Sequence, residues 1–286
     1  MLAQVRGTTI YFDVEGAGLV PDGPTMRERP VAMVIHGGPG GDHTGFKPAM
    51  SPLADVMQLI YFDHRGQGRS GRGNPARYTL DENVEDMEAL RRHLGLGQVV
   101  SIGTSYGGMV AMAHAARHPK AVSKLVLIVT AAHSGFMPRA EQFIRSHGTV
   151  EQQRACERLW SGTFGTADQM AEYYAAMGPL YSRRYVPAVA EAVRGRATYS
   201  PEPLNRAFGP GGVLRSFDLR AEIAGITVPT LVLAGRHDWI CPPEFSEEIH
   251  RLIPGSRLQI FEDSSHSIRA DEPDALNAAI RDFITG

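Results

Sequence analysis

The sequence predicts an α/β protein with a mostly parallel central sheet, helices on both faces of the sheet and an inserted helical cap. Short apolar runs alternate with amphipathic stretches along most of the chain. One long segment in the second half interrupts this alternation, and no internal repeat is present. Alternating strands and helices are typical of parallel sheets that helices cover on both sides.

The expected strands are short runs rich in apolar and β-branched residues, most of them bounded by Gly, Pro or Asp. They cover residues 9–14, 31–35, 58–62, 99–102, 124–129, 230–234 and 257–261. The expected helices are amphipathic and cover residues 80–94, 107–118, 243–253 and 273–284. Thr79 and Glu82 have the spacing of a capping box at the start of the first of these helices.

Residues 134–216 carry methionine, tyrosine and tryptophan side chains in a helix-like pattern and contain no convincing strand. We therefore expect residues 1–133 and 217–286 to form the core domain and residues 134–216 to form the cap. Some large cap side chains should face a ligand, while others form the cap's own core. The pocket candidates from the cap are Trp160, Tyr173, Tyr174, Met177 and Tyr181.

Composition excludes several classes of protein. The chain has 286 residues and a net charge of −2, so it has no global field that would attract nucleic acid or anionic lipid. Its apolar runs are far shorter than the roughly 20 residues that cross a bilayer. Cys156 and Cys241 cannot form a disulfide framework for a chain of this length, and no secretory signal is recognisable. We therefore expect a cytoplasmic protein.

The strongest functional signal is the sequence Gly-Thr-Ser-Tyr-Gly at 103–107, which follows an apolar run and precedes a predicted helix. A G-x-S-x-G sequence in a sharp strand-to-helix turn is typical of a nucleophile elbow, which exposes the serine hydroxyl. The helix that follows supplies unpaired N–H groups and positive potential for an oxyanion. Ser105 is the candidate nucleophile.

A serine hydroxyl needs a base, and the base needs an acid to orient it. The expected chain order after such an elbow is acid and then histidine, each beyond a late strand. Asp238 follows the strand at 230–234, and His266 follows the strand at 257–261. Asp263 is a second candidate acid, but a partner from another strand end would orient the imidazole of His266 more rigidly.

A glycine-rich loop, His-Gly-Gly-Pro-Gly-Gly at 36–41, follows the strand at 31–35. Backbone N–H groups of such a loop can bind a negative oxygen, so Gly37 or Gly38, together with Tyr106, are the expected oxyanion donors. A phosphate-binding loop is the alternative, but no Gly-Lys-Ser/Thr sequence follows.

Two further motifs favour structural roles. Residues 66–71 match G-x-G-x-x-G, but no helix follows directly, so we expect a turn in which Asp63 and Arg65 brace neighbouring loops. His114 and His118 are four residues apart on a predicted helix, but no third ligand accompanies them. We therefore expect neither a metal nor another cofactor.

With the glycine loop, the turn at 63–70, the elbow, and Asp238 and His266 in order, the chain resembles the α/β-hydrolase superfamily over essentially its whole length. The His-Gly-Gly-Pro-Gly-Gly and Asp-x-Arg-Gly-x-Gly-x-Ser segments are most similar to the proline iminopeptidase family, serine peptidases that remove an N-terminal proline. The resemblance implies a helical cap over the pocket. It also implies the triad Ser105, Asp238 and His266 and the oxyanion donors Gly37 or Gly38 and Tyr106.

The chain departs from that family where many of its members bind the free ammonium. They place one acid directly after the triad acid and another in a cap segment Gly-Pro-Asn-Glu. Here Trp239 follows Asp238, and the similar cap segment is Phe-Gly-Pro-Gly-Gly at 208–212. A buried ammonium without a carboxylate partner is strongly disfavoured. Other cap acids would have to replace the missing ones: Glu157, Glu172 or Glu191.

We therefore expect a serine hydrolase that cleaves a carboxylic ester, lactone or amide of a small, uncharged acyl group through an acyl-enzyme. The acyl group should lie against Trp239, Tyr106 and the cap aromatics. One alternative is a proline iminopeptidase-like aminopeptidase that acts on a free N-terminal amino acid. Another is a ligand sensor without turnover, although a pure binder does not need a nucleophile, an acid and a base. The expected partner is a small-molecule substrate, and the oligomeric state stays open.

Overall fold

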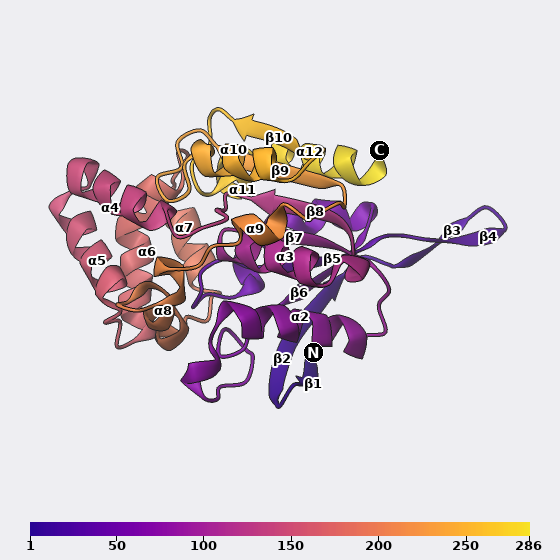
Figure 1. Cartoon of the computed structure of the whole chain (residues 1–286), viewed down its shortest axis with the longest axis horizontal. Helices are drawn as coiled ribbons and strands as arrows, with labels where there is room; N and C mark the ends of the chain where they lie inside the picture. The colour runs from indigo at the N-terminus through magenta and orange to yellow at the C-terminus, as the bar shows by residue number, and fades with distance from the viewer.

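The computed structural model describes residues 1–286, and its centre is an eight-stranded sheet (Figure 1). The strand order is β1-β2-β6-β5-β7-β8-β9-β10. The β1–β2 and β2–β6 pairs are antiparallel, and all other neighbours are parallel. The mostly parallel sheet confirms the predicted fold class.

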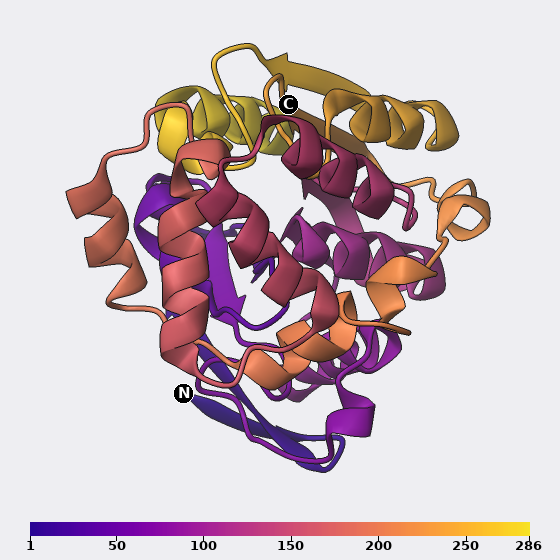
Figure 2. The same cartoon turned by 90° about the vertical axis from the view of Figure 1, so that its left-hand side faces the viewer.

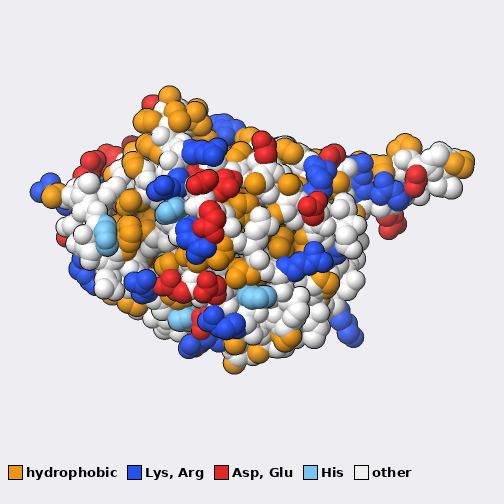
Figure 3. Space-filling model, turned by 90° about the horizontal axis from the view of Figure 1, so that it is seen from above, with side chains coloured by type: hydrophobic (Ala, Val, Ile, Leu, Met, Phe, Trp, Pro, Cys, Tyr) orange, Lys and Arg blue, Asp and Glu red, His pale blue; other side chains and the backbone are white.

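The strands have the following bounds: β1 Leu2–Val5, β2 Thr8–Glu15, β3 Leu19–Asp22, β4 Thr25–Glu28, β5 Val31–Ile35, β6 Gln58–Phe62, β7 Val99–Thr104, β8 Val122–Ile128, β9 Thr230–Gly235 and β10 Arg257–Phe261. β3 and β4 pair only with each other and form a hairpin that projects from the body of the molecule (Figures 1 and 3). Every predicted strand is present with its ends within two residues, whereas β1, β3 and β4 were not predicted.

The helices have the following bounds: α1 Lys47–Met50, α2 Leu80–His93, α3 Tyr106–Arg117, α4 Phe136–His147, α5 Val150–Ser161, α6 Ala167–Tyr181, α7 Pro187–Arg194, α8 Pro201–Phe208, α9 Arg220–Ile223, α10 Pro243–Leu252, α11 Ile268–Asp271 and α12 Pro273–Thr285. Thr79 caps α2, as predicted, because its hydroxyl accepts from the Glu82 N–H. No helix has both the length and the apolar character needed to span a membrane.

Helices cover both faces of the sheet because successive strand side chains point in opposite directions. In β5, Met33 and Ile35 join a core that includes α2 and α3. Ala32 and Val34 join a second core that includes α12. The strands are therefore buried on both faces, which explains why they are continuous apolar runs in the sequence.

Between β8 and β9, residues 136–208 form five helices, α4 to α8, which we call the helical insertion (Figure 2). Its entry and exit lie side by side, since the Ser134 N–H donates to Phe217 O and the Leu219 N–H donates to Ala132 O. The insertion has its own small core, which also includes Trp239 from the segment after β9. This packing holds the insertion over the ends of β7, β9 and β10.

The surface carries no large area of one charge on the face shown in Figure 3, where basic and acidic side chains are interspersed. Many of these charges form exposed pairs, such as Arg236 with Glu262 and Arg281 with Asp55. The distribution agrees with the small net charge of −2.

Candidate active site

Ser105 lies in the sharp turn between β7 and α3. Its φ of 55° and ψ of −121° are unusual for a residue with a side chain. The turn requires glycine on both sides: a Cβ on Gly103 would lie 2.3 Å from Gly107 O, and a Cβ on Gly107 would lie 2.2 Å from Ile35 O. The close packing of helix, turn and strand leaves Ser105 half-buried at the edge of a pocket.

His266 and Asp238 form a buried pair from the ends of two neighbouring strands. Nδ1 of His266 donates to Oδ2 of Asp238 at 2.7 Å. The other carboxylate oxygen of Asp238 accepts from the Ile240 and Cys241 N–H groups. The carboxylate is therefore fixed by backbone donors and in turn fixes the imidazole. Asp263, the alternative acid, is exposed and makes no hydrogen bond with His266.

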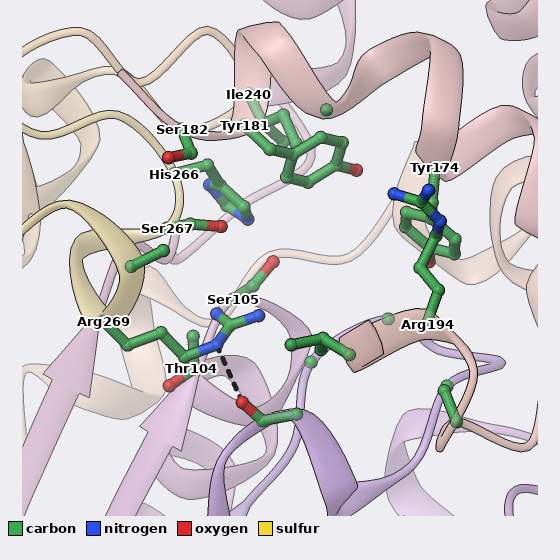
Figure 4. A pocket seen from close by; sticks show the side chains of 18 of the residues that line it. Thr104, Ser105, Tyr174, Tyr181, Ser182, Arg194, Ile240, His266, Ser267 and Arg269 are labelled. Atoms are coloured by element: carbon green, nitrogen blue, oxygen red, sulfur yellow. Dashed lines mark hydrogen bonds between the residues drawn. The ribbon is translucent and has the colours of Figure 1, made fainter. Parts of the chain in front are cut away.

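Ser105 and His266 line the same pocket, and Figure 4 shows both side chains pointing into one space. No hydrogen bond joins the Ser105 hydroxyl to the imidazole in this structure. Hydrogen bonds between a nucleophile and its base often shorten only when substrate binds. The arrangement brings the three predicted residues to one edge of the sheet, with Asp238 behind His266.

Gly37 lies beside Ser105, and Gly38 lines the same pocket. A Cβ on Gly37 would lie 3.2 Å from the Ser105 Cβ. The N–H groups of both glycines have no acceptor within the chain. Tyr106 is the first residue of α3, so its N–H has no helical acceptor either. These three donors are the ones predicted from the sequence, and their position suits an oxygen bound next to Ser105.

His36 holds this loop in place. Its Nε2 accepts from the His64 N–H at 3.2 Å, so the proton is on Nδ1, which donates to Gly37 O at 2.7 Å. Burial lowers the pKa of His36 and keeps the ring neutral. Asp63 supports the same region because its carboxylate accepts from the His43 and Arg69 N–H groups.

The pocket has a volume of about 630 Å³, within the range of small-molecule sites, and lies between the sheet edge and the helical insertion. Of the predicted pocket residues, these line it: Trp239, Trp160, Tyr173, Tyr174 and Tyr181. Met177 does not. It is fully buried inside the insertion, where its Sδ lies 3.7 Å from the Cys156 Sγ.

The cap acids considered as ammonium ligands, Glu157, Glu172 and Glu191, do not line this pocket. Four arginines that were not predicted from the sequence also line the pocket: Arg184, Arg194, Arg196 and Arg269. Arg269 could have been predicted as a pocket residue because it lies only three residues after His266 in the sequence. A pocket with arginines and no free carboxylate does not suit a substrate ammonium.

No group of three or more His, Cys, Asp or Glu side chains is arranged to hold a metal ion. His114 instead faces Glu88 at 3.1 Å, and His118 faces Glu85 at 2.8 Å. Arg65 forms a buried two-point contact with Asp86 on α2, so it braces the turn against a helix and not against a neighbouring loop as expected.

A serine elbow, a histidine–carboxylate pair and unpaired backbone donors at one edge of a mostly parallel sheet define an α/β hydrolase. The chain belongs to the α/β-hydrolase fold family, whose model matches residues 30–273, and it is a hydrolase. A proline iminopeptidase from Pestalotiopsis fici is 30% identical to it over 96% of this chain and 98% of its own length.

Solved structures extend this comparison. An enol-lactonase from Burkholderia xenovorans has a TM-score of 0.74 and 25% identity, with 100% of both chains covered. An esterase from Exiguobacterium antarcticum has a TM-score of 0.78 and 24% identity, and the match covers 100% of this chain and 99% of the esterase. Peptidase, lactonase and esterase names thus occur among proteins similar to this chain.

Proposed function

We propose that this protein is a serine hydrolase that cleaves a carboxylic ester, lactone or amide of a small acyl group through an acyl-enzyme. His266 removes the proton as Oγ of Ser105 attacks the carbonyl carbon. The N–H groups of Gly37 or Gly38 and of Tyr106 bind the oxyanion. His266 then protonates the leaving group, which departs. Water, deprotonated by His266, finally releases the acid and restores the Ser105 hydroxyl.

The observation that carries this proposal is the buried contact of 2.7 Å between Asp238 and His266, together with the pocket that His266 and Ser105 both line. Asp238 would stabilise the imidazolium that forms when His266 accepts the proton.

The direct experiment is Ser105→Ala, assayed on a neutral short-chain ester that the native enzyme cleaves. We expect kcat to fall by roughly four to six orders of magnitude, since the nucleophile is removed. An unchanged melting temperature would show that the fold is intact. Near-native turnover by a folded Ser105→Ala variant would contradict the proposal.

An aminopeptidase that acts on free N-terminal amino acids is the second candidate, supported by the 30% identity to a proline iminopeptidase. A prolyl arylamide, its N-acetylated form and a neutral ester separate the two candidates. We expect the neutral ester to be the best substrate, because none of the three cap acids lines the pocket. Strict dependence on the free amine would favour the aminopeptidase.

A further inference from the structure

The pocket in front of Ser105 has an uneven charge. Four arginines line it, at positions 184, 194, 196 and 269, against a single carboxylate, Asp42. That carboxylate is already engaged: it accepts from Thr44 through one oxygen and from the Thr198 N–H through the other. The pocket therefore contains several positive groups and no free negative one.

Arg269, on α11, is the arginine placed most directly at the reacting groups. It is half-buried, its Nε donates to Gly45 O at 3.2 Å, and its guanidinium lies 4.5 Å from the ring centre of Phe46. It makes no ion pair. Figure 4 shows its guanidinium on the same side of the pocket as Ser105.

The acid closest to Arg269 in the chain, Asp271, forms no ion pair with it. Asp271 accepts from the Ser182 hydroxyl and the Arg184 N–H with one oxygen and from the Ser265 N–H with the other. Burial lowers the pKa of the Arg269 guanidinium. A half-buried guanidinium without a counter-charge is costly, and a bound anion would remove that cost.

Two other donors in the pocket also lack an acceptor. Arg194, at the end of α7, is half-buried, makes no ion pair and points into the pocket beside Tyr174 in Figure 4. The indole N–H of Trp239 is buried without a hydrogen-bond partner. Arg194 and Trp239 therefore each bring a donor without a partner to the lining of this pocket.

We propose that the substrate of this hydrolase carries a carboxylate, which Arg269 binds in the pocket beside Ser105. The proposal rests on the proposed function and departs from the uncharged acyl group expected from the sequence, since the substrate would carry a negative charge. A carboxylate offers only acceptors and matches the fork of a guanidinium in a two-point contact. One carboxylate balances one half-buried guanidinium, whereas a phosphate dianion would bring a second charge into a largely apolar pocket.

The test compares pairs of substrates that differ only in charge. On the acyl side, ethyl hemiesters of succinate, glutarate and adipate are each compared with the ester in which a carboxamide replaces the carboxylate. On the leaving-group side, the butanoate ester of glycolate is compared with that of glycolamide. In at least one pair we expect a kcat/KM about tenfold or more higher for the carboxylate, the usual effect of a charged hydrogen bond.

The preference must depend on Arg269. Arg269→Gln should abolish the ratio of kcat/KM between carboxylate and carboxamide, and Arg269→Lys should retain part of it. Arg251→Gln, which removes an exposed arginine of α10 outside the pocket, should leave the ratio unchanged. No preference in any pair, or a preference that survives in a folded Arg269→Gln variant, would overturn the proposal.

Binding gives a readout that does not require turnover. Titration of the Ser105→Ala variant with glutarate should change the tryptophan fluorescence, since both tryptophans, Trp160 and Trp239, line the pocket. The additional change Arg269→Gln should weaken binding about tenfold or more. Inorganic phosphate that binds as tightly as glutarate would contradict a carboxylate site. Binding of glutarate to Ser105→Ala tests the carboxylate site without turnover. Loss of this binding therefore counts against the carboxylate site alone, whereas turnover by a folded Ser105→Ala variant counts against the proposed function alone.

Discussion

At the scale of single residues, the site depends on side chains whose orientation is fixed by hydrogen bonds on the side that faces away from the pocket. Asp238 is held by two backbone donors, and it fixes the ring of His266 so that Nε2 faces the pocket. Its carboxylate thus sets both the tautomer and the direction of the base. Loss of the negative charge alone should therefore disable the base, even if every atom stays in place.

Asp238→Asn tests this role. The amide can still accept from the Ile240 N–H, but it would present an NH₂ group to Nδ1 and favour the wrong tautomer of His266. We expect kcat on a neutral ester to fall by about 10³ to 10⁴, with KM nearly unchanged. Asp263→Asn, at an exposed position of the loop that carries His266, is the matched control and should keep full activity. A fall of less than tenfold in Asp238→Asn would contradict the assignment.

At the scale of elements, the elbow works only because β7, the turn and α3 pack without side chains between them. Gly107 touches the end of β5, and Gly103 touches Gly107. The two glycines of G-x-S-x-G are therefore packing requirements, and the backbone strain at Ser105 is held by the surrounding structure.

Gly107→Ala is expected to destabilise the protein by about 3 kcal/mol or more, because its Cβ would lie 2.2 Å from the Ile35 carbonyl oxygen and the backbone would have to move. Gly97→Ala is the matched control: nothing lies within 4 Å of its Cβ, so its stability should be close to native. Urea unfolding measures both. If the two variants were equally stable, there would be room for a Cβ at Gly107, and the close packing at the elbow would be contradicted.

The elements that the sequence did not predict lack a readable apolar face. In β1, Ala3 and Val5 are buried and alternate with exposed positions. One of the exposed residues, Leu2, is apolar as well, so the alternation cannot be read from the sequence. β3 and β4 are almost entirely exposed, and only their pairing with each other forms them. The buried parallel strands, by contrast, are continuous apolar runs that are easily recognised.

The same contrast holds for the site. Ser105 belongs to a local motif, and Asp238 and His266 follow strands in a fixed order, so sequence alone could identify them. Arg269 lies on a helix of four residues, and its lack of a counter-charge depends on the distant partners of Asp271. Helical spacing placed Met177 near Tyr173, but it could not show that Met177 faces Cys156.

At the scale of the whole molecule, buried carboxylates link stability to pH. Burial opposes ionisation of Glu88, but hydrogen bonds from Arg91, His114 and Arg92 outweigh it and hold its pKa well below the ordinary 4.5. Burial likewise opposes ionisation of Asp63, and the hydrogen bond from His43 outweighs it and lowers its pKa below 3.8. Both groups bind fewer protons in the folded state than in the unfolded state at acidic pH.

Burial also lowers the pKa values of His36, His64 and His114 below the ordinary 6.5, so these side chains too bind fewer protons in the folded state. The free energy of unfolding should therefore be highest above about pH 7 and fall as the pH decreases toward about 3. Glu88→Gln should be about 1–3 kcal/mol less stable near pH 7 and should lose less stability on acidification. Glu85→Gln, on the same helix but at a more exposed carboxylate, should keep the native pH dependence. Urea titrations at several pH values measure these slopes, and a Glu88→Gln slope as steep as the native one would contradict the linkage.

Covalent labelling tests the central claim most directly. A fluorophosphonate reacts only with a serine whose hydroxyl is activated by a neighbouring base, so intact mass and peptide mapping report the nucleophile itself. We predict one adduct per folded chain, located on Ser105, abolished in Ser105→Ala and formed far more slowly in Asp238→Asn. Folded native protein that stays unlabelled, as expected of a ligand sensor, or that is labelled at another residue, would contradict the account.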